Sequence, residues 1–590
     1  MSRLAAALAA VLLVPIVPLA QEAKKPEEVD AKTKAAIDRA VEKAKEDLRN
    51  EVRAEIQGAQ SAAEFLGAVA EGPKLEFFQV DGYYRFRGQL FVHLDLGAGR
   101  DPSGRYLFPI PFDQNGGEGR HTLNTANMRL RVEPTLNVSE HVRVRAQLDI
   151  LDNHVLGSST SSLYDDPNSP YPVPFYGSSR VVAPGSKQLD RPYISPKRAW
   201  AEVQTPVGLL SFGRMPSEWG LGIMANAGAG LDEDFGDSVD RIQFALPPVS
   251  TPIGRLTFVP ILDFDNEGPL YRQPFAAAGT GQPFDAESGD DGRTYALKIA
   301  RIDTDDEVRR KVERNEASVN YGAYYNYRTQ RYTYPDWTTQ GFDADLASTT
   351  AGPVTSVHRA AYAHVLDLWF RYLTSRWRVE AEASGTYGSI GDPRSDLTAA
   401  PKILLRQWGG ALVVDYKVSP NKFTLGGEVG AASGDSAPGF GNAPGFGPQP
   451  YGSLEGAQWS GADRSIRNFR FNPAYRVDLV LFHQILGQVT DALYLKPKFR
   501  WDLLPGLALD GQIVYSRALE AKSTPSVRAD GSGGSANLGI EADAVLTYGS
   551  GDGFHAWAQY GVLQPLGGLE TPGRSLSRAH VIATGLAAKF

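Results

Sequence analysis

The feature that most constrains the fold is a two-residue alternation of apolar and polar side chains that begins near Lys74 and continues to the last residue. Residues 84–96, 128–138, 142–150 and 377–387 each place apolar side chains on one face and mostly polar or charged side chains on the other. This is the period of a β-strand. The strands are longer than the roughly five or six residues usual in soluble sheets. The alternation therefore predicts an all-β region over residues 74–590.

The connections between these strands alternate in length. Short turns are predicted at 137–140, 205–208, 374–376, 419–422 and 550–553, and long polar loops at 152–193 and 434–468. Soluble sandwiches and propellers also contain alternating strands, but short turns at one end and long loops at the other are typical of transmembrane barrels. The sequence therefore predicts an antiparallel transmembrane β-barrel.

Aromatic residues on the predicted outer faces support this interpretation. Three pairs bracket apolar stretches, eight to ten residues apart: Tyr362 and Tyr372, Trp377 and Tyr387, and Trp408 and Tyr416. For tilted strands this spacing projects to roughly 20 to 25 Å, the height of the apolar band between two aromatic girdles.

Strand parity limits the size of the barrel. About nineteen candidate strands can be found, but a single-chain bacterial barrel with both termini in the periplasm needs an even number. Residues 476–487 do not alternate and fit a short helix better. About eighteen strands remain, a size at which an aqueous channel is expected.

The residues before the barrel have a different pattern. Residues 1–20 have a cationic start and a short apolar run, which predicts an export signal cleaved after Ala20. In residues 21–73, apolar side chains recur at an average spacing near 3.6 between Ile37 and Leu66, which predicts a long amphipathic helix in the periplasm. Such a helix could form a homo-oligomer, contact the cell wall, or serve as a solvated spacer.

Composition excludes several kinds of protein. The chain has no cysteine, so disulfide frameworks, thiolate catalysis and cysteine-ligated zinc are ruled out. Its net charge of -8 gives no support to a nucleic-acid partner. No HExxH, GxSxG or P-loop motif is present, and the nine histidines show no ligand spacing. The Gly-Asp-Ser segments at 236–238 and 434–436 are interpreted as turns. We therefore predict no enzyme, no cofactor and no metal.

The signal, the loop alternation and the C-terminal Phe590 resemble the outer-membrane barrels of Gram-negative bacteria. This resemblance implies outer-membrane lipid as the surroundings, the barrel-assembly machinery as a partner, and Phe590 as part of the assembly signal. More narrowly, residues 213–222, 237–241 and 475–479 are similar to an uncharacterised porin-like family of myxobacteria and their relatives. That resemblance implies where the protein is located and how it folds, and says little about its substrate.

The alternation also assigns side chains to the lumen. Seven arginines point inward from the first four predicted strands, which makes one wall basic: Arg85, Arg87, Arg129, Arg131, Arg143, Arg145 and Arg198. Glu380 and Glu382 point inward from later strands. The connection after the fifth strand carries four acidic residues: Asp232, Glu233, Asp234 and Asp237. In general porins the loop at this place folds inward and sets acidic residues against arginines. Such charges set pore selectivity.

These assignments predict a porin-like channel for passive diffusion of small polar or anionic solutes. A polysaccharide exporter of the alginate type remains an alternative, because a basic lumen would guide a polyanion. A third possibility is a plugged barrel with a structural role in the envelope, in which the arginines and acidic residues only brace the lumen. An outer-membrane lipase or esterase is the remaining class.

Overall fold

The structure is a computed structural model that describes residues 77–97, 108, 121–156, 194–265, 291–333, 357–391, 402–441, 464–528, 532–571 and 575–590. The predicted signal peptide and amphipathic helix lie outside the described residues. Within the described ranges, no helix is long and apolar enough to cross a membrane.

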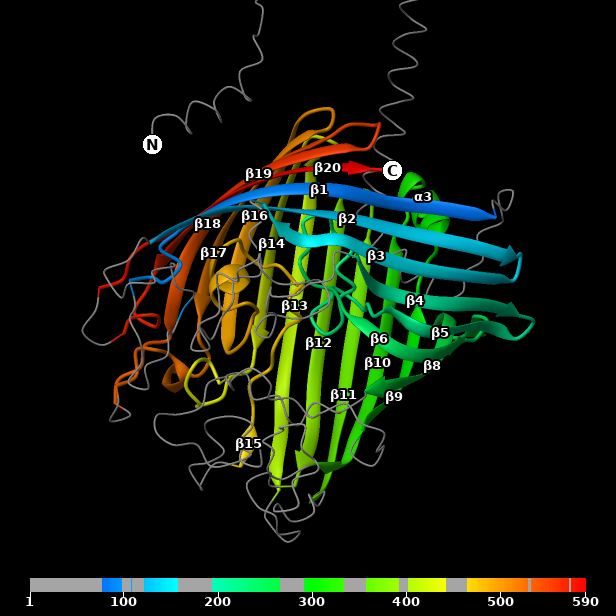
Figure 1. Ribbon diagram of the computed structural model, residues 1–590, viewed down its shortest axis with the longest axis horizontal. Coiled ribbons are helices and arrows are strands. Elements are labelled where there is room, and N and C mark those ends of the chain that lie inside the picture. Colours follow the sequence, from blue (N-terminus) through cyan, green and yellow to red (C-terminus); the bar gives the residue numbers. More distant parts are fainter. Residues whose placement is uncertain are drawn as a thin grey trace, which may run out of the picture. The chain divides into compact units, whose positions relative to one another are not determined.

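The described chain forms a closed antiparallel barrel. Strand β1 (Phe78–Val92) pairs with β2 (Thr122–Ser139) on one side and with β20 (Ala579–Lys589) on the other, so the sheet has no free edge there (Figure 1). The wall continues through β3 (Val142–Val155), β4 (Ile194–Thr205), β5 (Gly208–Pro216), β6 (Ser238–Ala245), β8 (Gly254–Asp265), β9 (Gly292–Arg301), β10 (Ser318–Thr333), β11 (Val357–Leu373), β12 (Trp377–Ile390), β13 (Ile403–Ser419), β14 (Phe423–Ala432), β16 (Ala492–Leu504), β17 (Leu507–Arg517), β18 (Asn537–Gly549) and β19 (Phe554–Pro565).

Two further short strands do not add to the wall. β7 (Val249–Thr251) pairs with β8 just after β6 ends, and the two-residue β15 (Ser465–Ile466) pairs in parallel with β13. The sheet of twenty described strands therefore contains eighteen wall strands, as the parity argument predicts.

The predicted turns are confirmed, and three helical elements accompany the described strands, one of which is the short 3-10 helix η5 (Ala521–Ser523). Each of the five predicted short turns joins neighbouring wall strands. The segment that fails to alternate contains a one-turn π-helix, Leu481–Ile485, as expected for a non-strand segment. The helix α3 (Asp305–Glu313) is not predicted; it begins at a reciprocal capping box between Thr304 and Glu307.

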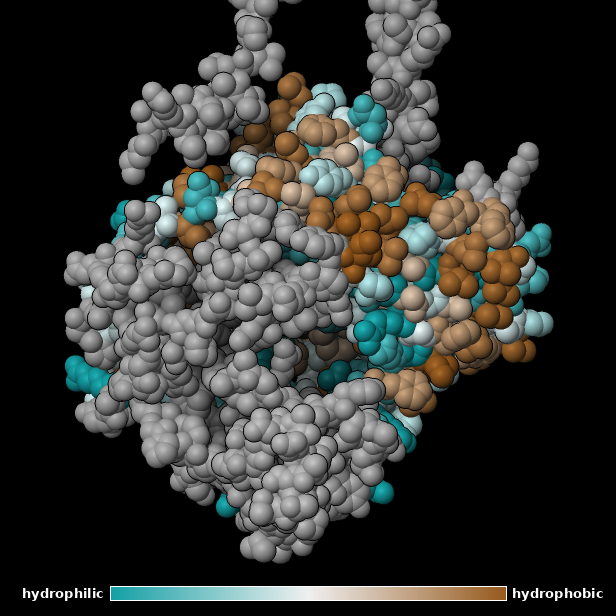
Figure 2. Space-filling model, viewed as in Figure 1, coloured by the Kyte–Doolittle hydropathy of each residue, from teal (hydrophilic) through white to brown (hydrophobic). Residues whose placement is uncertain are grey.

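The outer face of the barrel is apolar. Leu366, Leu368 and Phe370 on β11 are all exposed, and Trp377 of β12 packs against Tyr416 of β13 with the rings tilted and their centroids 4.5 Å apart. Brown, hydrophobic side chains gather over the described strands β1 to β8 in the space-filling view (Figure 2). The inner face is the opposite, since charged residues there are among the largest fully buried side chains of the described chain.

The chain closes on its last residue. The Phe590 backbone exchanges two hydrogen bonds with Gly82 of β1, of 3.0 and 3.1 Å. A Cβ atom at Gly82 would lie 2.8 Å from the Phe590 ring and closer still to the Arg131 carbonyl oxygen. Glycine at position 82 therefore lets the terminal aromatic ring lie against β1.

Candidate functional site: a lumen narrowed by two inward segments

Two connections fold into the barrel. The β5–β6 segment comprises residues 217–237, and the β14–β16 segment comprises the described residues 464–491. Ile223 of the first segment and Val477 and Phe482 of the second are at most 2% exposed, and all three belong to one apolar cluster. Burial of these side chains away from water favours the inward position of both segments.

Carboxylates on the wall hold each segment by its backbone. Glu382 of β12 accepts hydrogen bonds from four successive N–H groups at residues 221–224. Glu541 of β18 accepts three in the same way, from residues 479–481, at 2.7 to 2.9 Å. Converging backbone N–H groups form an anion-binding concavity, so each wall carboxylate completes a turn of the segment.

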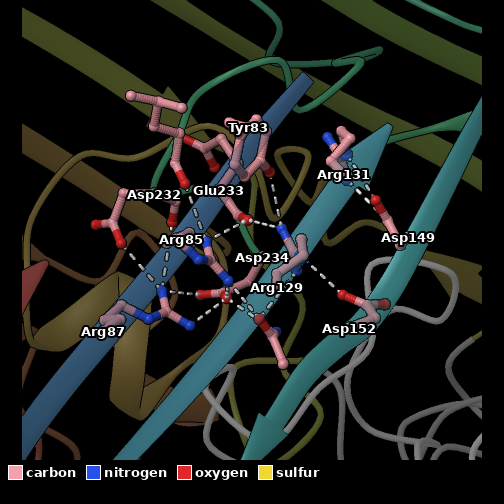
Figure 3. Close-up of polar contacts among 12 residues, drawn as sticks. Tyr83, Arg85, Arg87, Arg129, Arg131, Asp149, Asp152, Asp232, Glu233 and Asp234 are labelled. Carbon is pink, nitrogen blue, oxygen red and sulfur yellow. Dashed lines mark hydrogen bonds and ion pairs between the residues drawn. The ribbon is translucent and has the colours of Figure 1, made fainter. Parts of the chain in front are cut away.

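Three of the predicted arginines, on β1 and β2, contact the acidic stretch of the β5–β6 segment (Figure 3). Arg87 contacts Asp234 at 2.6 Å and Asp232 at 3.1 Å. Arg85 and Arg129 donate to the Glu233 backbone carbonyl at 3.2 and 2.8 Å. Both also donate to the same side-chain oxygen, Oδ1 of Asn153, and Arg129 pairs with Asp152 at 2.7 Å.

The second inward segment completes this cluster with another arginine. Arg476 contacts Asp232 at 2.8 Å and lies 3.5 Å from the Glu233 carboxylate. Asn472 of the same segment donates to Asp237 at 2.6 Å. Four guanidinium groups therefore face four carboxylates, and the cluster of Arg85, Arg87, Arg129, Arg476, Asp152, Asp232, Glu233 and Asp234 is balanced in formal charge.

The loop acids differ in how their environment affects ionisation. Burial opposes ionisation of Asp232, but the nearby Arg476 and Arg87 guanidiniums lower its pKa to about 2. The pKa of Asp234 is also lowered, because Arg87 outweighs the effect of burial. At Glu233, burial prevails and raises the pKa. Asp232 and Asp234 therefore remain ionised more readily than Glu233 in the β5–β6 segment.

Two further predicted arginines are buried but lie beside this cluster. Arg131 makes a two-pronged contact with Asp149 of β3, at 2.7 and 2.9 Å. Arg198 donates to the backbone carbonyls of Ala227 and Asp237, at 2.6 and 2.9 Å. These side chains brace the wall and the base of the inward segment.

Arg143 and Arg145 do not join the cluster. Both lie near the short turn that begins β3 and face Glu202 of β4, at 3.5 and 3.6 Å. These two arginines therefore belong to the basic wall but lie apart from the other predicted arginines, because Arg143 and Asp152 stand near opposite ends of β3.

The predicted acidic residues of β12 also have bracing positions. Glu380 accepts a hydrogen bond from the Trp369 indole at 2.9 Å and pairs with Arg378 at 2.9 Å. Glu382 holds the β5–β6 segment, as described above. Both are nearly fully buried, at 4% and 2% exposure.

Sequence reasoning missed Arg476, Asp152 and Glu541. A signal for Arg476 was present, because the three sequence motifs at 213–222, 237–241 and 475–479 all contribute to the two inward segments or their ends. Glu541 could have been found from the alternation in β18, where it is the inward neighbour of Asp543.

One mouth of the lumen carries exposed positive charge. At the short-turn end, Arg143 and Arg378 face inward with side chains 46% and 41% exposed. Their acidic partners Glu202 and Asp415 are only 12% and 17% exposed. At these two ion pairs, water and solutes therefore meet the guanidinium groups more than their carboxylate partners.

No known family model and no curated protein matches the chain. Among solved structures, OccK2 (OpdF) of Pseudomonas aeruginosa in complex with glucuronate has a TM-score of 0.42 and 8% identity, over 88% of this chain and 99% of that one. OccK11 (OpdR) of the same organism has a TM-score of 0.41 and 12% identity, over 87% and 96%. OmpTdeltaL8, a loop L8 deletion mutant of an outer membrane protein of Vibrio cholerae, has a TM-score of 0.33 and 9% identity, over 87% and 100%. Similarities this weak transfer no function, and the barrel assignment rests on the strand pairing of the chain itself.

Proposed function

We propose that this protein is an outer-membrane channel for passive diffusion of small polar solutes, with a preference for anions. Its apolar outer face suits lipid, while its inner face carries ionised side chains that only water or ion pairing can satisfy. A narrowed lumen is consistent with small solutes, because two segments occupy part of the interior.

The anion preference rests on one observation: at the short-turn mouth of the lumen, two arginine side chains are more exposed than the carboxylates that pair with them. Arg143 and Arg378 are exposed while their acidic partners are largely covered. The central arginines contribute little net field, since they face an equal number of carboxylates. A fixed positive charge at a mouth lowers the barrier to anions and raises it for cations.

Planar-bilayer recording of the purified protein tests this proposal. We expect ohmic single-channel steps and a reversal potential that indicates anion preference in a KCl gradient. Arg143→Gln combined with Arg378→Gln should move the reversal potential toward cations at about 0.1 M salt, and much less at about 1 M, where the Debye length is about 3 Å. Arg214→Gln is the control, because Arg214 is 53% exposed and alternates with inward residues of β5. Equal shifts for the control and the double variant would contradict the proposal.

A plugged, structural barrel is the second candidate, and the apolar cluster favours it. Phe471, Val480 and Ile485 of the β14–β16 segment are at most 1% exposed, so this part of the interior is packed as a protein core is. Absence of conductance from correctly folded protein would support this candidate over the channel.

The remaining expectations complete the proposal. Residues 1–20 would direct export, residues 21–73 would form a periplasmic helix, and Phe590 would present the aromatic group to the barrel-assembly machinery. The exposed ring of Phe590, 58% accessible at the end of β20, supports that role.

A further inference from the structure

We propose that His93, Asp95 and His121 form a binding site for a divalent transition-metal ion, independent of any channel activity. His93 and Asp95 follow β1, and His121 precedes β2, so the three residues flank a connection at the long-loop end of the barrel. The candidate ligand atoms all lie within 4.8 Å of one another. The sequence gives no sign of this site, because His121 lies 26 positions after Asp95, too far for a local ligand motif.

The separations between the side chains suit one ion. Nδ1 of His121 lies 2.9 Å from one oxygen of Asp95, and Nδ1 of His93 lies 3.9 Å from the other. Two ligands at the usual distance from a tetrahedral zinc ion are roughly 3.3 Å apart. The observed distances lie on either side of this value, and small side-chain rotations would bring them to it.

Unsatisfied polar atoms point to a missing partner. Among the described residues, neither Oδ1 of Asp95 nor Nδ1 of His93 has a hydrogen-bond partner, although both atoms are buried. Their separation of 3.9 Å is too long for a hydrogen bond between them. Leaving such atoms unpaired is unfavourable, and a cation between them would satisfy both.

The backbone already holds the ligands in place. The His93 N–H donates to the His121 carbonyl at 2.7 Å, and the two imidazole rings stack with centroids 4.4 Å apart. The histidine side chains are 33% and 40% exposed, so an ion can reach them from solution, while the Asp95 side chain is 10% exposed. The site therefore needs little ordering when it binds.

The ligand set selects the class of ion. Two imidazoles and one carboxylate suit Zn²⁺ or Cu²⁺, whereas Ca²⁺ and Mg²⁺ prefer oxygen ligands alone. Three protein ligands leave one coordination position for water. The bound ion would tie the ends of β1 and β2 together at the base of their connection.

The test is zinc binding by the folded full-length protein, purified without a polyhistidine tag and measured by isothermal titration calorimetry with Zn²⁺ alone. We expect one ion per chain, with Ca²⁺ at a thousandfold excess leaving binding unchanged. His93→Gln, His121→Gln and Asp95→Asn should each weaken binding by at least about tenfold. His141→Gln, in the exposed turn between β2 and β3, is the matched control and should bind as the original chain does.

Asp95→Asn keeps the shape of the side chain, and heat-modifiability on gels confirms that each variant is folded. The proposal is overturned if the original chain binds less than half an equivalent of Zn²⁺, if Ca²⁺ competes, or if His141→Gln weakens binding as much as the three ligand variants. The proposal is supported if Zn²⁺ binding is lost in the three ligand variants, all of them folded, and kept in the control variant.

Discussion

The buried pair of Arg87 and Asp234 allows a direct test of how strongly the β5–β6 segment is held in the lumen. The arginine is fully buried, Asp234 is 1% exposed, and the shortest contact between them is 2.6 Å. In Arg87→Met, the nearest remaining cations to Asp234 are Arg476 and Arg85, at 3.8 and 3.9 Å. Removing one partner of a buried ion pair costs about 3 to 5 kcal/mol, and both remaining cations lie too far from Asp234 to replace the hydrogen bonds that Arg87 donates to it.

The measurement is equilibrium unfolding in a chemical denaturant with the barrel in lipid vesicles, arranged as a double-mutant cycle. We expect Arg87→Met to lower the free energy of unfolding by about 3 to 5 kcal/mol, and Arg87→Met with Asp234→Asn to lower it by less than the sum of the single changes. The matched control is Arg143→Met, because this inward arginine is 46% exposed and 3.5 Å from Glu202. Exposed ion pairs contribute about 0 to 1 kcal/mol to the free energy of unfolding. Equal losses for Arg87→Met and Arg143→Met would refute the bracing argument.

Other predictions concern the wall, the barrel closure and pH. Leu130→Arg, on the outer face, should lower the free energy of unfolding by about 2 to 4 kcal/mol near the membrane centre. Arg131→Leu should also be costly, by about 3 to 5 kcal/mol, since it removes the two-pronged guanidinium contact of the buried Asp149, and a negligible loss would contradict the pairing. Gly82→Val should lower the yield of heat-modifiable barrel, because a Cβ there meets the terminal ring; a normal yield would show that the chain end is not held there. Deleting Phe590 should impair assembly in cells, and normal outer-membrane yield would contradict its assembly role. The pKa of Asp232 is lowered to about 2, so its stabilising effect is complete above about pH 4 and is lost as the pH falls toward 2. Current noise should therefore rise between pH 4 and pH 2.5, and unchanged noise over that range would contradict this role of Asp232.

The wall of the barrel could be predicted well because its rules are local. A period of two assigns each side chain to a face, so Arg129 and Arg131 were placed inward and Leu130 outward without any knowledge of the fold. Turn lengths fixed which ends of the strands lie together, and parity removed the one false strand. The inward β5–β6 segment came instead from a positional likeness to general porins.

The partners of the inward residues could not be predicted in the same way. Arg476 is 244 residues from Asp232 in the chain, and nothing in the period of either segment specifies their contact. The alternation placed Arg143 on the same face as Asp149, but only the pairing of β3 with β4 shows that it lies beside Glu202 at the mouth.

The two histidines of the proposed metal site also show what the sequence does not reveal and the structure does. His93 and His121 are unremarkable in sequence, because the residues between them hide their proximity, and only the pairing of β1 with β2 brings them together. The sequence by itself determined the barrel, its two faces and the sign of the charges that face inward, because these follow from side-chain alternation. The tertiary structure decided which charges neutralise one another and which stay exposed, because closing the sheet and folding two segments inside it places distant residues in contact.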